Sequence, residues 1–330
     1  MANTKIKGMI MLKKLLYSLL ILAMVLSFAG CSKQSEDKTE TSQTTQTTEQ
    51  TQPAISKVKT YAFFGLDTRP DSESSRSDVI MLIRLDPELE NIKIMSVYRD
   101  TLLDVDGLKK CNAAYSLGGA NRAIKMLEEN LDVDIDGFMS ADFKTVADTI
   151  DDLGGIDLEI TEEEAHYANA YIREMNNLYN GNVSEITSGM QHLNGIQAVA
   201  YARIRYTEGW DYKRTERQRT VLTLMFQKFQ KADNLIQKTI TVRAFENVYT
   251  DMNENSAINL IQDIANYECA DSAGFPKYKT GRSIEGQGDC VVPDDLEKNV
   301  KWLHEFLYDE ENYTPSDKVL NINSQIKTYI

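Results

Sequence analysis

The segment from Thr60 to Thr101 constrains the fold most strongly, because it holds three apolar runs that each meet charged residues at one end. The runs are 60–66, 79–85 and 92–97, and each predicts a buried β-strand. The turn signal at 86–91 and the polar loop at 68–77 are each short enough to reverse the chain. We therefore predict that the three strands are antiparallel neighbours in one sheet.

Antiparallel order gathers the charged strand ends at one edge of that sheet. The residues concerned are Asp67, Arg69, Arg76, Asp78, Arg99 and Asp100. Each of them alone is typical of an ordinary strand end in a solvated loop. Guanidinium and carboxylate groups held together beside apolar strands lose hydration, and such clusters bind anions or metals more often than they stabilise a fold. We therefore interpret the edge as a functional site.

The rest of the chain alternates between helical and extended patterns. Helices are predicted over 122–130, capped by Asn121, over 142–153, 256–265 and 294–308, and strands over 137–140 and 156–160. The polar segment 161–188 shows no period and is expected to be an irregular lid or insertion. Helices that alternate with strands after an antiparallel start predict a mixed α/β sheet with helices on its faces.

Two arginine-rich segments follow. Residues 201–206 alternate so that Arg203 and Arg205 share one face, and no carboxylate is expected beside either of them. A helix is predicted from Lys213, and the basic residues in its first turns oppose the helix dipole unless a bound anion faces them. For Arg217 and Arg219 a solvated basic face explains the pattern equally well.

Composition excludes several classes of function. A net charge of −14 and a pI near 4.8 exclude a nucleic-acid partner, since the phosphate backbone attracts basic surfaces. The chain contains no P-loop, nucleophile elbow, zinc spacing or dinucleotide fingerprint, and its 3 histidines are scattered, which argues against a histidine-based triad.

The first 30 residues have the pattern of a lipoprotein signal peptide, with a basic start, a short apolar stretch and the sequence Ala29-Gly30-Cys31. Lipidation of Cys31 is expected, and an uncleaved spanning anchor is the alternative. Residues 31–58 are rich in Ser, Thr and Gln and predict a disordered linker. Export to an oxidising compartment allows a Cys269–Cys290 disulfide, although the two cysteines could share one region by coincidence.

Seven motifs resemble, in order and approximate spacing, those of the LytR-CpsA-Psr proteins of Gram-positive bacteria. They are GLDTR, RSDVIML, SVYRDT, KCNAAYSLGG, DDLGGI, LNGIQAVAYARIR and DYKRTERQR, within residues 60–229. The resemblance implies a catalytic domain at 59–312, a C-terminal tail at 313–330, and an apolar tunnel in the sheet for a polyprenyl chain. It also implies an extracytoplasmic, membrane-attached phosphotransferase that moves a teichoic acid-like or capsular glycopolymer from a polyprenyl-pyrophosphate carrier to a peptidoglycan hydroxyl.

The resemblance assigns roles to individual residues. Asp67 and Asp78 match aspartates that bind Mg²⁺, with Mn²⁺ as a possible substitute, and together with Arg76 and Arg99 they form the implied catalytic set. The pyrophosphate contacts implied are Arg76, Arg99, Lys110, Arg203, Arg205, Asp211, Arg214 and Gln218. Tyr98 departs from the family pattern, in which proline is common at this position. The proton acceptor stays open between Asp67, Asp78 and Asp100.

Two other functions remain as alternatives. A non-catalytic binder of anionic wall polymer or lipid-linked sugar would need the arginines but not the two aspartates. A pyrophosphatase acting on the same carrier would release phosphate without transfer. Magnesium-dependent turnover and product analysis with and without an acceptor distinguish the three.

Overall fold

The structure is a computed structural model, and it describes residues 58–67 and 76–329. The predicted signal peptide, the lipidation site at Cys31, nearly all of the linker and Arg69 therefore lie outside the described residues. None of the described helices is both long and apolar enough to cross a bilayer.

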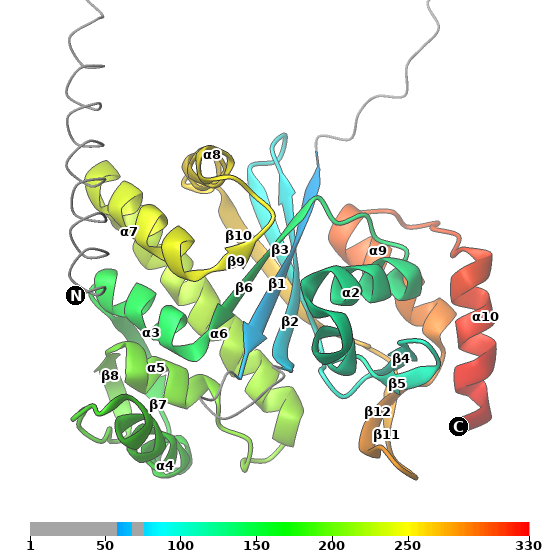
Figure 1. The fold of residues 1–330 in the computed structure, drawn as a ribbon, viewed down its shortest axis with the longest axis horizontal. Helices are drawn as coiled ribbons and strands as arrows, with labels where there is room; N and C mark the ends of the chain where they lie inside the picture. Colours follow the sequence, from blue (N-terminus) through cyan, green and yellow to red (C-terminus); the bar gives the residue numbers. More distant parts are fainter. Residues whose placement is uncertain (1–57, 68–75, 330) are drawn as a thin grey trace, which may run out of the picture. The chain divides into compact units, whose positions relative to one another are not determined.

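A six-stranded mixed sheet forms the centre of the described region (Figure 1), in the order β10-β3-β2-β1-β6-β9. Its strands are β1 (Lys59–Leu66), β2 (Ser77–Asp86), β3 (Asn91–Val97), β6 (Gly137–Asp142), β9 (Tyr249–Thr250) and β10 (Glu268–Phe275). The β1–β2 and β2–β3 pairs are antiparallel, as the sequence predicts, whereas β1–β6 and β3–β10 are parallel. The mixed α/β fold class is thereby confirmed.

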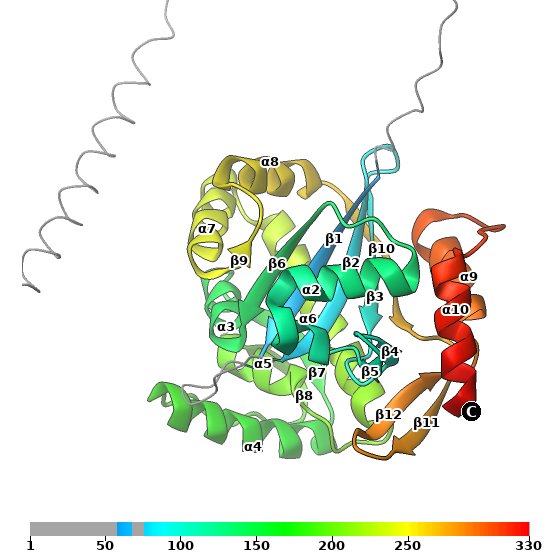
Figure 2. The same ribbon diagram turned by 45° about the vertical axis from the view of Figure 1, so that its right-hand side comes forward.

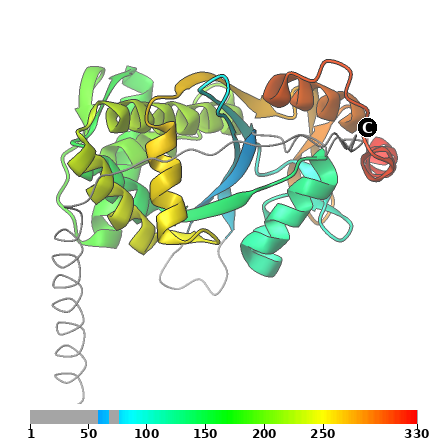
Figure 3. The same ribbon diagram turned by 90° about the horizontal axis from the view of Figure 1, so that it is seen from above.

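Helices cover both faces of this sheet (Figure 3), because alternate side chains of its strands point to opposite sides and both sets are apolar. On one side Phe64, Leu82 and Met95 are buried in the same cluster as residues of α2 (Ala113–Leu131) and α9 (Leu296–Tyr308). On the other side Met81 and Ile94 pack with residues of α6 (Trp210–Lys231) and α8 (Glu254–Ile264). Figure 1 shows α7 (Asn234–Asn247) near α8, on the side of the sheet away from α2.

A helix lies within the segment expected to be a C-terminal tail. It is α10 (Asp317–Ile326), followed by the 3-10 turn η1 (Lys327–Tyr329). The side chains of Val319, Ile322 and Ile326 are buried in the same cluster as α2 and α9. The tail therefore contributes to the core.

A second apolar cluster lies beside the sheet and carries part of the site. It is built from α3 (Phe143–Asp152), β7 (Ile156–Ile160), α4 (Glu162–Tyr179), β8 (Gly189–Leu193), α5 (Gly195–Ala202) and the adjoining part of α6. The helix predicted over 142–153 is confirmed as α3, and Asp142 caps its start, since the Asp142 carboxylate accepts a hydrogen bond from Thr145 N.

The expectation of an irregular segment at 161–188 is wrong, because α4 occupies most of it. Its start is fixed by a capping box in which the Thr161 hydroxyl accepts from Glu164 N and the Glu164 carboxylate accepts from Thr161 N. Only a narrow apolar stripe is buried, namely Ala165, Ala168, Ile172 and Met175. The many polar residues around this stripe hide the helical period.

Two other boundaries differ from the prediction. The helix expected from residue 122 begins at Ala113, and Gly118 and Gly119 form a kink inside it. Gly119 has a φ of +67°, which a residue with a side chain rarely adopts. Residues 201–206 are not extended: α5 runs to Ala202 and the chain then turns.

Two short hairpins lie beyond one end of the sheet (Figure 2). One joins β4 (Leu102–Asp104) to β5 (Leu108–Lys110), and the other joins β11 (Lys279–Ile284) to β12 (Gly288–Pro293). The described cysteines Cys111, Cys269 and Cys290 are all free thiols. A Cys269–Cys290 disulfide is therefore not formed: Cys269 lies in β10 and Cys290 in the β11–β12 hairpin.

Candidate functional site

The charged strand ends gather at one edge of the sheet, where β1 ends and β2 begins. Leu66 pairs with Ser77 across the two strands, so Asp67 and Asp78 follow directly from paired positions. Both aspartates line a cavity of about 220 Å³. Its other lining residues are Phe143, Tyr171, Glu174, Arg203, Arg205, Tyr206, Arg214 and Gln218. We call this space the first cavity.

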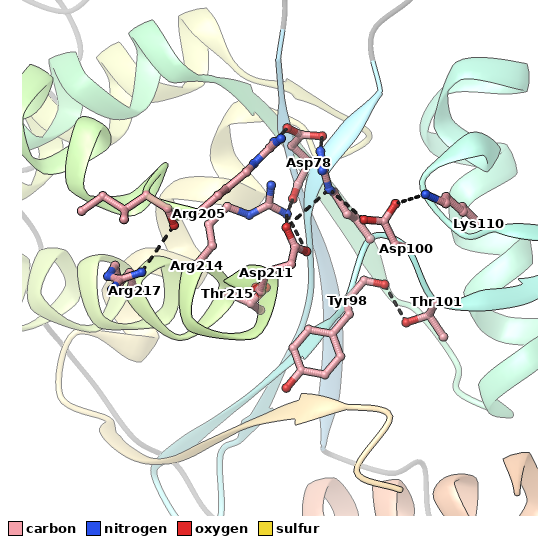
Figure 4. A network of polar contacts seen from close by, with 12 residues as sticks. Asp78, Tyr98, Asp100, Thr101, Lys110, Arg205, Asp211, Arg214, Thr215 and Arg217 are labelled. Atoms are coloured by element: carbon pink, nitrogen blue, oxygen red, sulfur yellow. Dashed lines mark hydrogen bonds and ion pairs between the residues drawn. The ribbon is translucent and has the colours of Figure 1, made fainter. Parts of the chain in front are cut away.

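Asp78 lies at the centre of a network of guanidinium groups (Figure 4). Its Oδ1 accepts from Arg99 Nη1 at 2.7 Å, and its Oδ2 accepts from Arg205 Nη2 at 2.9 Å. Its backbone oxygen accepts from Arg214 Nη2 at 3.4 Å. Burial alone would raise the pKa of Asp78, but the charges of Arg99, Arg214 and Arg205 outweigh burial and hold that pKa below its usual value.

Arg214 reaches this network from the first turns of α6 and is only 2% exposed. It is bonded to Asp211 one turn earlier, at 2.9 Å. Burial lowers the pKa of the Arg214 guanidinium to about 10, and the charges of Arg99 and Arg205 act in the same direction, against that of Asp211. Asp211 also lies 3.8 Å from Arg99 Nε and so links α6 to the segment after β3.

Arg203 and Arg205 line the same cavity, but the expectation that neither has a carboxylate beside it is wrong. Arg203 donates to Glu174 of α4 at 3.2 Å, and Arg205 donates to Asp78 at 2.9 Å. The Arg203 guanidinium also lies 4.9 Å from the ring centres of both Phe143 and Tyr171. These partners hold the two guanidiniums in place at the wall of the cavity.

Arg217 belongs to the interior, so a solvated basic face is wrong for this residue. It is 6% exposed, forms an ion pair with Glu164 at 3.0 Å and donates to the Thr207 hydroxyl at 2.8 Å. The pair joins α6 to the start of α4. Gln218, the next residue, lines the first cavity.

A second, larger cavity of about 600 Å³ adjoins the network on the side of α2. It is lined by Arg76, Arg99, Asp100, Leu108, Lys109, Lys110, Asn112, Ala113, Glu285, Gly286 and Gln287. Lys110 Nζ lies 3.0 Å from Asp100 Oδ1, and Asp100 Oδ2 lies 3.4 Å from Arg99 Nε. The residues predicted for one edge therefore divide between two cavities, which the Asp78–Arg99 pair joins.

Some residues of the site were not foreseen. Tyr171 and Glu174 come from α4, which the sequence pattern failed to reveal, although the Thr161-x-x-Glu164 capping signature could have indicated its start. Glu285 and Gln287 come from the tip of the β11–β12 hairpin, and no local signal relates that tip to Lys110.

Asp67 and Asp78 are the aspartates of the first cavity that could bind a metal ion. The part of the chain that the structure describes contains no group of three or more His, Cys, Asp or Glu side chains arranged to hold an ion. Asp67 and Asp78 provide two carboxylates in one cavity, which is the number of protein ligands that Mg²⁺ commonly uses when phosphate oxygens complete its shell.

Comparison with known proteins yields a consistent set of similarities. The profile of the LytR_cpsA_psr family matches residues 24–277. The chain is 30% identical over 272 residues to the polyisoprenyl-teichoic acid–peptidoglycan teichoic acid transferase TagV of Bacillus subtilis strain 168. That match spans 77% of this chain and 64% of the relative, so the chain covers less than two thirds of the relative's length.

Solved structures show the same fold. The crystal structure of B. subtilis TagV superposes with a TM-score of 0.62 at 25% identity, covering 79% of this chain and 99% of that one. A LytR-CPS2A-psr family protein, YwtF (TagT), solved with bound octaprenyl pyrophosphate lipid, superposes with a TM-score of 0.56 at 21% identity, covering 76% and 90%.

Proposed function

The chain belongs to the LytR-CpsA-Psr family, and we propose on that premise that it is an extracytoplasmic glycopolymer–peptidoglycan phosphotransferase. It would transfer a teichoic acid-like or capsular polymer from a polyprenyl-pyrophosphate carrier to a hydroxyl of peptidoglycan. The name of the TagV relative, a polyisoprenyl-teichoic acid–peptidoglycan transferase, supports this reaction. The observation that carries the proposal is the network of Arg99, Arg205 and Arg214 around Asp78.

The network suits a diphosphate. The guanidiniums of Arg99, Arg205 and Arg214 converge on Asp78, and guanidinium groups are strong charge-assisted donors to phosphate oxygens. Arg203 and Gln218 line the same cavity and add donors, while Arg76 and Lys110 approach from the second cavity. Phosphoryl transfer needs charge stabilisation and positioning more than covalent help, and this arrangement can supply both.

We propose that Asp67 and Asp78 also hold Mg²⁺, or Mn²⁺ in its place, together with oxygens of the diphosphate. When bound, the ion would neutralise part of the charge that develops on the diphosphate. The Asp78 oxygens are both bonded to guanidiniums, and the depressed pKa of Asp78 keeps this carboxylate ionised, as a cation ligand must be.

In the reaction, the acceptor oxygen forms a bond to the phosphorus that carries the glycopolymer, and the bond from that phosphorus to the bridging oxygen breaks. The lipid leaves as polyprenyl phosphate, and the hydroxyl proton passes to a carboxylate. Asp100 is the best placed acceptor among the three candidates. Asp67 and Asp78 are both assigned to the ion, and each Asp78 oxygen also accepts from an arginine, whereas Asp100 is outside the proposed ion site, lines the second cavity and pairs with Lys110 and Arg99.

The prenyl chain would occupy the face of the sheet that α7 and α8 cover. A small cavity of about 130 Å³ lies between the sheet and the pair α7 and α8, lined by residues such as Tyr61, Ile83, Phe245, Leu260 and Ile264. A polyprenyl chain is much larger than this space, so binding would require α7 or α8 to move outward from the sheet.

We further propose that the protein acts at the outer face of the cell membrane, anchored through lipid on Cys31, with the linker giving the domain its reach. Changing Cys31→Ala in cells should leave an unprocessed precursor. A mature protein that still begins upstream of Cys31 would instead indicate a spanning anchor.

The test of the proposed reaction is product analysis. The full chain is incubated with a labelled short-chain prenyl-pyrophosphate-linked glycopolymer, with and without soluble peptidoglycan strands. Transfer predicts label on peptidoglycan and an equal amount of prenyl phosphate, both dependent on the acceptor. Phosphate release at the same rate with and without the acceptor would indicate a pyrophosphatase. Binding of the donor without turnover would indicate a non-catalytic binder.

A further inference from the structure

We propose that the second cavity binds the acceptor, as a site for a sugar of a peptidoglycan strand, and that the β11–β12 hairpin forms its outer wall. The proposal rests on the transferase function argued above. It assigns the second substrate to residues of the hairpin that lie beyond the part of the chain matched by the family profile, which ends at residue 277.

The position of the cavity favours the acceptor. Displacement at phosphorus brings the attacking oxygen in from the side opposite the leaving oxygen. The apolar cavity proposed for the lipid lies under α7 and α8, whereas the second cavity lies at the start of α2 and beside β5. Figure 1 shows these elements on opposite sides of the central sheet. With the diphosphate between them, a hydroxyl arriving from the second cavity would face the leaving group.

The chemistry of the lining suits a carbohydrate. Leu108 and Ala113 are the only apolar side chains that line the cavity within the described residues. The remaining side chains are charged or amide groups, which can donate hydrogen bonds to sugar hydroxyls and to acetamido oxygens, or accept them from hydroxyls and acetamido N–H groups.

Asn112 places a side-chain amide at the wall of the cavity. The residue is 4% exposed and lines the cavity, yet none of the described residues hydrogen-bonds its side-chain amide. It also stands at the N-cap of the 19-residue α2 without capping that helix. The Asn112 amide is not among the fully buried polar atoms that lack a partner, so it is accessible from the cavity, where a ligand can bond to both its oxygen and its N–H groups.

The hairpin is fixed to the segments that carry Asp100 and Lys110. The Gln287 side chain accepts from Lys110 N at 3.2 Å and donates to Leu108 O at 2.9 Å, so it continues the edge of β5. Farther along the hairpin, Val291 N donates to Asp100 O at 2.9 Å. The hairpin thus fixes the backbone of Asp100, whose carboxylate we propose receives the proton, and Gln287 is a positioning residue for the acceptor.

The test measures acceptor and donor kinetics separately. The full chain, with Asn112→Ala or Gln287→Ala, is assayed with the labelled donor and soluble peptidoglycan strands of defined length. Ser283→Ala is the control, since Ser283 is exposed on the same hairpin and does not line the cavity. Each site variant should raise the acceptor KM by about three- to tenfold, the effect of one or two hydrogen bonds. The donor KM and the donor dissociation constant should stay within twofold of wild type.

The possible outcomes separate the two proposals. If the wild-type chain performs no transfer, the proposed function fails and the acceptor site with it. If transfer occurs but both variants keep the wild-type acceptor KM at an unchanged melting temperature, only the acceptor site is overturned. A rise confined to the donor KM would assign the cavity to the donor glycan and would also overturn the proposal. Should Asn112→Ala lower the melting temperature, Gln287→Ala at the hairpin tip still decides the question.

Discussion

Asp78 and Arg99 are 21 residues apart in the chain, yet their side chains form an ion pair of 2.7 Å that joins the two cavities of the site. Antiparallel pairing explains the proximity, because β2 begins and β3 ends at the same edge of the sheet. The pair links the proposed diphosphate site to the proposed acceptor site, and the predictions below follow from it and its neighbours.

The first prediction concerns stability in acid. The folded-state pKa of Asp78 is depressed, so its ion pairs stabilise the native state above the unfolded-state pKa, about 4. This contribution is lost as the pH falls through the folded-state pKa. In metal-free buffer, Asp78→Asn should lower the free energy of unfolding near pH 7 by about 1–3 kcal/mol. Below about pH 4, the free energy of unfolding of the variant should depend less on pH than that of the wild type. Denaturant unfolding of both proteins between pH 2 and pH 7 measures this, and parallel curves would contradict it.

The second prediction concerns donor affinity. Arg203→Ala and Arg205→Ala each remove a charge-assisted donor from the first cavity, a contribution of about 1.5–3 kcal/mol. Binding of a short prenyl pyrophosphate should weaken by roughly ten- to a hundredfold in either variant. Lys213→Ala is the matched control, because Lys213 is an exposed cation of the same region whose ion pair is with the surface residue Glu216. Unchanged binding in a folded Arg203→Ala/Arg205→Ala double variant would rule out the assignment.

The third prediction separates structural from functional arginines on α6. Arg217→Ala would leave Glu164 without its partner at the junction of α6 and α4, and breaking a buried ion pair costs about 3–5 kcal/mol. Since Glu164 is partly exposed, the lower end of that range is expected. Thermal unfolding should show a clear loss of stability, while the folded fraction should bind the prenyl pyrophosphate within about threefold of wild type. A large loss of affinity at unchanged stability would move Arg217 into the site.

Much of this organisation could be predicted from sequence. The three opening strands follow from apolar runs with charged ends, and the antiparallel order from two short connections. Helix α4 was missed because its buried stripe is narrow and its other positions are polar. The Arg203–Glu174 pair depended on that missed helix, which explains why no carboxylate was expected there.

Other features depend on tertiary contacts that leave no local trace. The Arg217–Glu164 pair spans 53 residues, and the Gln287–Lys110 contact spans 177. A periodic pattern reports which face of an element is buried, but it does not report which distant polar group meets that face. For this reason the division of the charged edge into two cavities became visible only in three dimensions.

The fourth prediction concerns the proton acceptor. Asp100→Asn keeps the size of the side chain but removes the base, so transfer should fall by about a hundredfold or more. Donor binding should stay within about threefold, since Asp100 lies in the second cavity. Single-turnover transfer and equilibrium donor binding, measured on the same preparation, test this. Transfer at more than a tenth of the wild-type rate would assign the proton to another group.

The central claim is that a carboxylate pair and an arginine network transfer the polymer with the help of a divalent cation. The most direct measurement is transfer activity against Mg²⁺ and Mn²⁺ concentration for the wild-type chain, Asp67→Asn and Asp78→Asn, with a melting curve for each. The account predicts that chelator abolishes wild-type transfer, that both variants are inactive at ordinary Mg²⁺ although folded, and that high Mg²⁺ or Mn²⁺ restores part of their activity. Full activity in Asp78→Asn, or wild-type transfer that persists in excess chelator, would contradict the account.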